Sequence, residues 1–159
     1  MMKSRIIIVG KGGSGKDLLK DRFISKGYKP SISFTTRPKR EKEIHGETYN
    51  FIDKSLFKSM IDSKMFFEYK EFRGWFYGTA IMELEIADLF IMTPPAIVEL
   101  DKEIRDTSMV IYINIEESIR EQRLSNRNDA DSIQRRLKAD REMFDDFTDF
   151  DLEITNPKF

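Results

Sequence analysis

Short apolar runs alternate with helical patterns along most of this chain. Four β-branched residues in a row, from Ile6 to Val9, predict a strand that is buried on both faces of a parallel sheet. Segments 87–92 (ADLFIM) and 109–115 (MVIYINI) predict two further strands of this kind, and Pro94 and Pro95 end the first of them. We expect a helix between these two strands and a last short strand at LEIT, residues 152–155.

Two other stretches have helical spacing. The first begins at Lys16 and ends before Gly27, which supplies a C-terminal stop. Its recurring apolar residues are Leu18, Leu19, Phe23 and Ile24. The second stretch, 117–147, is broken near SNRNDADS, where Asn, Asp and Ser favour a turn and a new N-cap. The expected buried stripe after that break consists of Ile133, Leu137, Phe144 and Phe147.

The segment between these patterns, residues 31–79, has a different character. Turn signals occur at Arg37-Pro38 and at His45-Gly46, and the alternating runs ETYNFI and FFEYKEF predict short, half-exposed strands. We interpret this segment as a small antiparallel lobe inserted into an α/β core. The chain is therefore expected to be an α/β protein with a parallel sheet flanked by helices.

Composition narrows the classes of protein that fit this pattern. A chain of 159 residues that is 40% hydrophobic is long enough for one compact domain and too short for two of ordinary size. Because no apolar run could cross a bilayer and no signal peptide is evident, we expect a cytoplasmic protein without a membrane partner. The chain has no cysteine, which excludes a disulfide scaffold. Its net charge of −1 gives no positive field to bind a nucleic-acid backbone, so we expect no nucleic-acid partner.

The turn after the first strand carries the clearest chemical signal. Its residues fit the pattern G-x-x-x-x-G-K between a predicted strand and a predicted helix. Glycines let successive N–H groups point at phosphate oxygens, and the helix N-terminus adds partial positive charge. We therefore predict an ATP-binding phosphate loop, with a tight glycine turn and a solvated lysine as the alternative. Its candidate ATP-binding residues are Gly10, Lys11, Gly12, Gly13, Ser14, Gly15, Lys16 and Asp17.

Asp17 stands where this loop usually has a serine or threonine that binds Mg²⁺. A carboxylate there suits the positive end of the helix dipole and is still a hard oxygen ligand. It also brings negative charge towards a polyphosphate. Asp17 is therefore the candidate metal ligand, direct or through water, and a purely capping role is the alternative.

A second group of candidate residues lies in the inserted lobe. Arg37 and Arg40 are three residues apart in a proline-marked loop, where two guanidinium groups could converge on an anion. Tyr49 could add a hydroxyl to that site. Further along, FFEYKEFRGWFYGT places Glu68 in an apolar strand, followed by Tyr77, Gly78 and Thr79 at a turn. For most of these aromatics ordinary strand packing is sufficient, but packing does not account for Glu68 among them.

The order of these motifs resembles that of guanylate kinases. The likeness rests on the phosphate loop, the S-x-TTRP-x-R…G-x-x-Y-x-F run, the F-x-E…YGT run and the arginine-bearing segment near the C-terminus. It is dense over residues 6–79 and 113–156 and weak over 80–110. The resemblance implies a three-layer P-loop kinase fold with a mixed or antiparallel lobe that binds a nucleoside monophosphate (NMP), and a helical lid.

The resemblance also implies a division of the single domain, residues 1–159. The core is expected at 1–32, 81–117 and 137–159, the NMP-binding lobe at 33–80 and the lid at 118–136. Within this division Arg37, Arg40, Tyr49 and Tyr77 match residues that bind the acceptor phosphate. The residues that match the guanine-contacting positions are Ser33, Glu68 and Thr79, with Gly78 beside them.

The predicted catalytic residues are all cationic. The resemblance implies that lid arginines close over the triphosphate, although i,i+4 pairing on a solvated helix face is the alternative for them. Lys16 would reach the β- and γ-phosphates. The catalytic set is Lys16, Arg37, Arg123, Arg127 and Arg136.

The chemistry of guanine supports the position matched by Glu68. One carboxylate can accept from both adjacent donors of guanine, a pair that adenine lacks.

We therefore expect an ATP- and Mg²⁺-dependent kinase that phosphorylates GMP or dGMP. The chain departs from the family at IMTPPAI, around Thr93, where guanylate kinases usually carry an acidic motif. That departure keeps open a kinase of the same fold that acts on another nucleoside monophosphate or a sugar phosphate. A non-catalytic guanylate kinase-like binding module is a further alternative, which the intact phosphate loop opposes. Monomer and homodimer both remain open, as does a bacterial or viral source.

Overall fold

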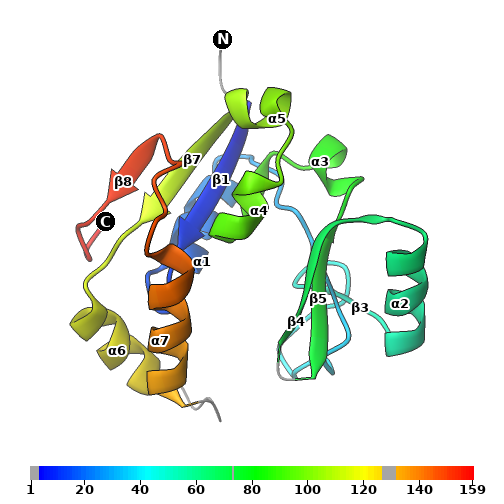
Figure 1. Ribbon diagram of the computed structural model, residues 1–159, viewed down its shortest axis with the longest axis horizontal. Coiled ribbons are helices and arrows are strands. Elements are labelled where there is room, and N and C mark those ends of the chain that lie inside the picture. The colour runs from blue at the N-terminus through cyan, green and yellow to red at the C-terminus, as the bar shows by residue number, and fades with distance from the viewer. Residues whose placement is uncertain (1–3, 73, 127–131) are drawn as a thin grey trace. The chain divides into compact units, whose positions relative to one another are not determined.

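The computed structural model describes residues 4–72, 74–126 and 132–159 of the chain. The chain divides into two compact units (Figure 1). The core unit consists of Met1–Tyr28 and Leu89–Phe159, and the inserted unit consists of Lys29–Asp88. The inserted unit contains the whole segment that the sequence pattern sets apart.

The core unit is built on a parallel four-stranded sheet. Its strand order is β6-β1-β7-β8, and each neighbouring pair is parallel. Ile7, Ile8 and Val9 are each 0% exposed, and because successive strand side chains point to opposite faces, both faces of the sheet are covered. The strands are β1 (Arg5–Gly10), β6 (Leu89–Ile91), β7 (Ser108–Ile113) and β8 (Leu152–Ile154). The four predicted core strands are thus present.

Helices cover this sheet. They are α1 (Lys16–Ile24), α4 (Pro94–Val98), α5 (Lys102–Asp106), α6 (Glu117–Ser125) and α7 (Ile133–Phe144). Two short helices, α4 and α5, stand where one was expected; Pro94 begins the first of them, at a helix position that needs no amide donor. In α7, Leu137 and Phe144 are buried as predicted. In α1 only Leu19 is buried, whereas Leu18 and Ile24 are exposed.

One apolar cluster joins α1 to the sheet. Ile6 and Ile8 of β1 pack there with Leu19 of α1, and Ile111 and Ile113 of β7 complete its centre. Burying such aliphatic side chains contributes roughly 1.5–3 kcal/mol each. The cluster lies under the beginning of α1, so it holds the strand and the helix that flank the glycine loop.

The inserted unit contains a second sheet with the order β3-β2-β5-β4. β2 and β3 pair in parallel, whereas β5 is antiparallel to both β2 and β4, so the sheet is mixed. Its strands are β2 (Phe34–Thr35), β3 (Asn50–Phe51), β4 (Phe66–Phe72) and β5 (Trp75–Ala80), and its helices are α2 (Lys54–Asp62) and α3 (Glu83–Ile86). The Asp53 carboxylate caps α2 by accepting from the Leu56 N–H, at 2.8 Å.

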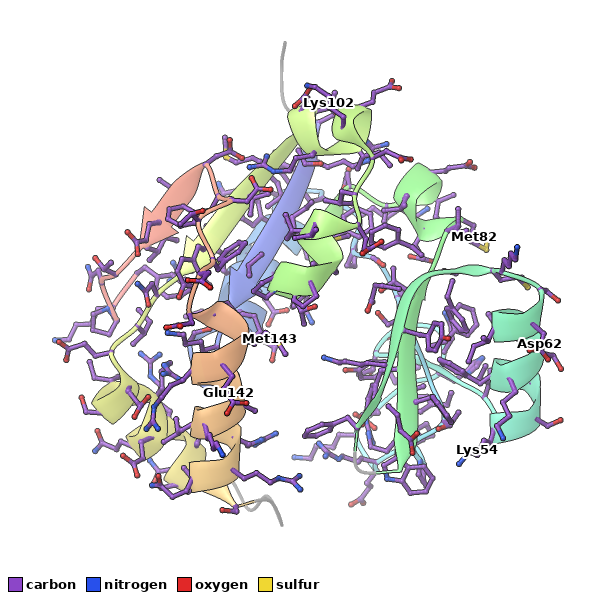
Figure 2. All side chains as sticks on the ribbon, viewed as in Figure 1. Lys54, Asp62, Met82, Lys102, Glu142 and Met143 are labelled. Atoms are coloured by element: carbon purple, nitrogen blue, oxygen red, sulfur yellow. The ribbon has the colours of Figure 1, made fainter. Side chains whose placement is uncertain are left out.

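Aromatic packing holds α2 against this sheet. Phe57 of α2 is fully buried, and its ring stacks on those of Phe66 and Phe76, with centroids 4.4 and 5.3 Å away. A Cβ at Gly78 would lie 2.8 Å from the Phe66 ring, so only glycine fits there. Figure 2 shows side chains filling the space between the strands and α2, whose ends are marked by Lys54 and Asp62.

Among the described residues, no helix combines the length and the apolar character needed to cross a membrane.

Candidate nucleotide-binding sites

The glycine loop joins the end of β1 to the start of α1 in the core unit. Gly13 and Gly15 have φ angles of +75° and +100°, in the left-handed region that favours glycine. A Cβ at Gly10 would lie 2.5 Å from the Ser14 Oγ and 3.1 Å from the Ile113 carbonyl oxygen. Backbone conformation and close packing therefore both require the glycines of the predicted motif.

The lysine of the motif points back across the loop. The Lys16 ammonium donates to the carbonyl oxygens of Gly10, at 2.7 Å, and of Lys11, at 3.1 Å. Its charge therefore lies inside the curve of the loop. When a phosphate binds there, Lys16 would exchange these carbonyl partners for charged phosphate oxygens. This is the position that the sequence predicts for a phosphate-binding cation.

The first turn of α1 carries Asp17. Gly15 occupies the N-cap without a side-chain hydrogen bond, so the amides of this turn face outward from the helix end. Asp17 is exposed, and its carboxylate pairs with Lys20 at 3.3 Å. Nowhere in the described ranges do three metal-ligating His, Asp or Glu side chains gather. A single exposed carboxylate fits an Mg²⁺ ion that takes most of its ligands from nucleotide phosphates.

Lys11 leaves the loop on its other side. Its ammonium lies 5.7 Å from the Phe144 ring centroid, which is a cation–π geometry. Burial lowers the pKa of Lys11, and the charge of Arg120 lowers it further, while Asp140 and Glu117 oppose the change. Lys11 lines an open cavity of about 450 Å³ together with several aromatic residues. Those residues are Tyr112, Phe144, Phe147 and Phe150.

The predicted lid arginines are in different situations. Arg123 of α6 donates to the carbonyl oxygens of Gly13, at 3.0 Å, and Pro157, at 2.8 Å, so it contacts the glycine loop directly. Arg136 lies on α7 and is half-buried. Arg127 lies outside the described residues. A second cavity, of about 430 Å³, lies beside the loop and is lined by Gly13, Gly15, Leu18, Arg123, Asn126, Pro157 and Phe159.

The inserted unit brings together the three residues predicted to contact a guanine base. Glu68 and Thr79 are directly opposite each other in the β4–β5 pair, and the Thr79 hydroxyl donates to the Glu68 carboxylate at 2.7 Å. The Ser33 Oγ lies 3.4 Å from the Thr79 Oγ. These residues are far apart in the sequence, and the strand register places their polar atoms in one cluster, which we call the Ser33–Glu68–Thr79 cluster.

Arg37 lies in a separate anion-binding arrangement of the same unit. Its guanidinium binds Glu43 with both nitrogens, at 2.6 and 3.0 Å, and stacks near the rings of Tyr49 and Phe51. The hydrogen bond to Glu43 raises the pKa of Arg37, with a smaller contribution from Tyr77, and it lowers the pKa of Glu43. The rings of Tyr49 and Tyr77 are 6.1 Å apart, so three of the four predicted phosphate-binding residues lie close together.

The other two predicted residues of this unit have different surroundings. The Arg40 side chain is exposed, and its backbone N–H donates to Glu43 at 2.7 Å. Gly78 is buried, and the Phe66 ring leaves no room for a Cβ there, so packing explains why this residue is glycine. Glu43 therefore organises the loop that carries both arginines.

Sequence reasoning missed three charged residues at these sites. Glu43 follows Arg37 by six residues in a loop, a spacing that specifies no contact by itself. Arg120 precedes Arg123 by one helical turn, so i,i+3 spacing was an available signal that both would face the same side. Asp140 accepts from the Gly12 N–H at 2.9 Å, across 128 positions of sequence, and no local pattern could predict that contact.

Known proteins of similar sequence include several guanylate kinases. The family model described as guanylate kinase matches residues 2–159. A guanylate kinase of Blochmanniella pennsylvanica is 47% identical over half of the chain, and that match spans 40% of the relative. Guanylate kinases of Nostoc sp. and Prochlorococcus marinus are 28% and 30% identical; both alignments cover 97% of the chain, and 82% and 89% of those relatives.

The fold agrees with that assignment. The crystal structure of guanylate kinase from Anaplasma phagocytophilum superimposes with a TM-score of 0.69 at 20% identity. The superposition covers 98% of this chain and 78% of that one. The predicted α/β fold, with its parallel core sheet and inserted lobe, is confirmed.

Proposed function

The chain belongs to the guanylate kinase family, and we propose that it transfers the γ-phosphoryl group of ATP to GMP or dGMP. The observation that carries the proposal is that one chain has both an intact phosphate loop and the converged Ser33–Glu68–Thr79 cluster. A binding module without kinase activity has no use for the first, and a general phosphate-binding protein has no use for the second. The two observations come from different units and support the same reaction.

The donor triphosphate binds at the glycine loop. Backbone amides that follow Gly12 surround the phosphates, and the N-terminus of α1 stabilises their charge. Lys16 exchanges its contacts with the carbonyls of Gly10 and Lys11 for the β- and γ-phosphate oxygens. The cavity beside Gly13 and Gly15 has room for the remainder of the nucleotide.

The acceptor binds in the inserted unit. The Glu68 carboxylate accepts from the N1–H and the exocyclic amine of guanine, while the hydroxyls of Ser33 and Thr79 supply further hydrogen bonds. Arg37, Arg40, Tyr49 and Tyr77 bind the acceptor phosphate. Because the Arg37 guanidinium is planar and already bidentate with Glu43, it has the geometry that a phosphate requires.

Catalysis in this proposal is positioning and charge neutralisation, without a covalent intermediate. Lys16 stabilises the charge that develops on the transferred group. Residues 118–136 form a lid that excludes water and whose arginines, Arg123, Arg127 and Arg136, approach the phosphates. Bound Mg²⁺ would neutralise phosphate charge, with Asp17 as its protein ligand. Residues 33–80 are the acceptor lobe and the rest of the chain is the core.

A coupled ADP-release assay tests the proposal directly. ATP and Mg²⁺ are supplied with each common nucleoside monophosphate and its deoxy form, and a sample without acceptor measures hydrolysis. We expect GMP and dGMP to give the highest kcat/KM. Release of ADP that no acceptor increases would contradict the kinase, and a preference for AMP, CMP or UMP would contradict the role of Glu68.

A further inference from the structure

The glycine loop is held from outside by a buried arginine. Arg120, on α6, is 1% exposed and is the largest of the fully buried side chains described. Its guanidinium donates to the carbonyl oxygens of Ile115, at 3.0 Å, and Gly12, at 3.3 Å. It also pairs with Asp140 of α7 at 3.4 Å. A buried guanidinium is costly unless its donors are matched, so this set of partners is what permits the burial.

Asp140 completes the arrangement from a second helix. The oxygen that faces Arg120, Oδ2, also accepts from the Gly12 N–H at 2.9 Å. The two polar backbone groups of Gly12 are therefore bound by opposite charges, its N–H by Asp140 and its carbonyl by Arg120. In Figure 1, α6 and α7 lie side by side, and these residues link both helices to the loop after β1.

This contact fixes the direction in which loop amides point. In a planar trans peptide the carbonyl and the N–H point in opposite directions. Because Arg120 holds the Gly12 carbonyl towards α6, the N–H of the same peptide, which belongs to Gly13, points away from α6. The fit leaves little freedom: a Cβ at Gly13 would lie 2.9 Å from the Arg120 carbonyl oxygen, and one at Gly12 would lie 3.3 Å from Asp140.

We propose that Arg120 and Asp140 are positioning residues that, by holding the Gly12 backbone, keep the amides after it, beginning with the Gly13 N–H, oriented for binding the ATP phosphates. The inference rests on the proposed function, since it assumes that the loop binds ATP. Neither residue contacts the nucleotide itself. Asp140 fixes the loop by its hydrogen bond, and Arg120 both holds the Gly12 carbonyl and neutralises a carboxylate that would otherwise repel a polyphosphate.

Two pairs of variants separate these contributions. Asp140→Ala removes the acceptor of the Gly12 N–H, whereas Asp140→Asn keeps an amide oxygen in its place. Arg120→Lys keeps the charge next to Asp140, but one ammonium cannot replace the planar guanidinium on two carbonyls and a carboxylate. The matched control is Asp149→Ala, which removes a carboxylate from Arg105 near the amino end of β7, the end of the sheet opposite the loop.

Calorimetry with ATP and with GMP, each added alone, measures the effect without turnover. We expect the ATP dissociation constant to rise about tenfold in Asp140→Ala and about fivefold in Arg120→Lys, as expected for the loss of one hydrogen bond. Asp140→Asn should stay within about threefold, and GMP affinity should be unchanged in all of them. Amide hydrogen exchange of the loop peptide should accelerate in Asp140→Ala and not in the control.

The outcomes distinguish this inference from the function on which it rests. ATP affinity that is unchanged in both Asp140→Ala and Arg120→Lys overturns the positioning role and leaves the kinase intact. Equal losses of ATP and GMP affinity would mean general structural damage and would also overturn it. If the unaltered protein binds no ATP, the proposed function fails and the inference fails with it. If Asp140→Ala does not fold, the ATP affinity of Arg120→Lys compared with that of Asp149→Ala tests the same inference.

Discussion

The glycine loop and the Ser33–Glu68–Thr79 cluster, which we propose as the two nucleotide sites, are built in different ways. The loop uses backbone groups from one continuous stretch, and its shape depends on glycines with positive φ. The cluster uses side chains from segments far apart in sequence, and its shape depends on strand register. A backbone site is thus sensitive to conformation and to the contacts that hold the loop, whereas a side-chain site is sensitive to the identity of single residues. Variants of each site test that difference.

The largest effect is expected at Lys16, the cationic side chain of the phosphate-loop motif. Lys16→Met keeps the length of the side chain but removes the cation from the transferring phosphate. We expect kcat to fall by about 10³, with GMP affinity unchanged, because the acceptor residues belong to the inserted unit. Steady-state kinetics and GMP calorimetry measure the two quantities. Lys26→Met, beyond the end of α1, is the control, and a wild-type kcat in Lys16→Met would contradict the donor assignment.

The matching change in the cluster is Glu68→Gln. The amide presents a donor where guanine also has a donor, so one hydrogen bond becomes a repulsion. We expect kcat/KM for GMP to fall about 30-fold to 100-fold, while ATP affinity stays constant. Glu71→Gln, at an exposed position of the same strand, serves as the matched variant. Equal loss in both variants would show that Glu68 has no specific part in acceptor selection.

Gly78 of the inserted unit has a steric role, unlike Gly46 and Gly74 of the same unit, whose φ angles are positive. Gly78→Ala places a methyl group 2.8 Å from the Phe66 ring and 3.1 Å from that of Phe57. We expect a loss of about 1–3 kcal/mol of unfolding free energy from overpacking, measured by urea denaturation. Gly74→Ala is the comparison, because no atom lies within 4 Å of its Cβ position although its φ is +78°. Because Gly74→Ala carries only the cost of a positive φ, it measures that cost separately, and unchanged stability in Gly78→Ala would contradict the steric account.

The ion pair between Arg37 and Glu43 predicts a pH dependence. The bond from Arg37 lowers the pKa of Glu43 below 4.5 in the folded chain. A carboxyl group with a lowered folded pKa stabilises the protein above its unfolded pKa, and that stability is lost as pH falls through the folded value. Glu43→Gln should therefore be less stable by about 1 kcal/mol at pH 7, and the difference should shrink towards pH 3.

Thermal unfolding of the two proteins between pH 3 and pH 7 measures this trend. The exposed neighbour Glu41, changed to Gln, controls for the loss of one negative charge. A constant difference between Glu43→Gln and the unaltered chain across this range would show that the pair does not titrate as described.

The smallest effect is expected at Asp17. Its carboxylate is exposed and already paired with Lys20. In the proposed site, Asp17 would be only one Mg²⁺ ligand, and phosphate oxygens would supply most of the others. Asp17→Ala should raise the Mg²⁺ concentration for half-maximal activity about threefold, with the activity at saturating Mg²⁺ retained. Asp21→Ala, one turn further along α1, is the control. An unchanged Mg²⁺ requirement would leave Asp17 with a capping role only.

The sequence predicts the parts of this molecule that are local. The glycine loop, the strand before it and the helix after it follow from a continuous motif and from a run of β-branched residues. The break between α6 and α7 follows from its turn-forming residues. The local pattern singled out Arg37, Arg40, Tyr49 and Glu68, whereas the roles of Ser33, Tyr77 and Thr79 came from the resemblance to guanylate kinases, because nothing in the local pattern brings Ser33 next to Thr79.

The parts that could not be predicted depend on tertiary contacts. The parallel pairing of β2 with β3 results from the path of the intervening loop, which turn signals do not specify. Pro94 marks the end of a strand, but its second effect, starting α4, depends on the packing of the residues after it. Asp140 and Gly12 are in contact only because α7 returns to the end of β1. The charges of the chain are evenly interspersed along the sequence, so no charge pattern could predict a buried ion pair at the loop.

The bidentate pair of Arg37 and Glu43 has a consequence for selectivity among anions. An incoming anion must compete with the Glu43 carboxylate that already binds Arg37. Weakly binding anions, such as chloride or a singly charged organic acid, therefore gain nothing by displacing that carboxylate. A dianionic phosphate ester brings twice the charge and more acceptor oxygens. If this loop binds the acceptor phosphate as proposed, the Glu43 carboxylate already in place favours phosphate esters over more weakly charged anions.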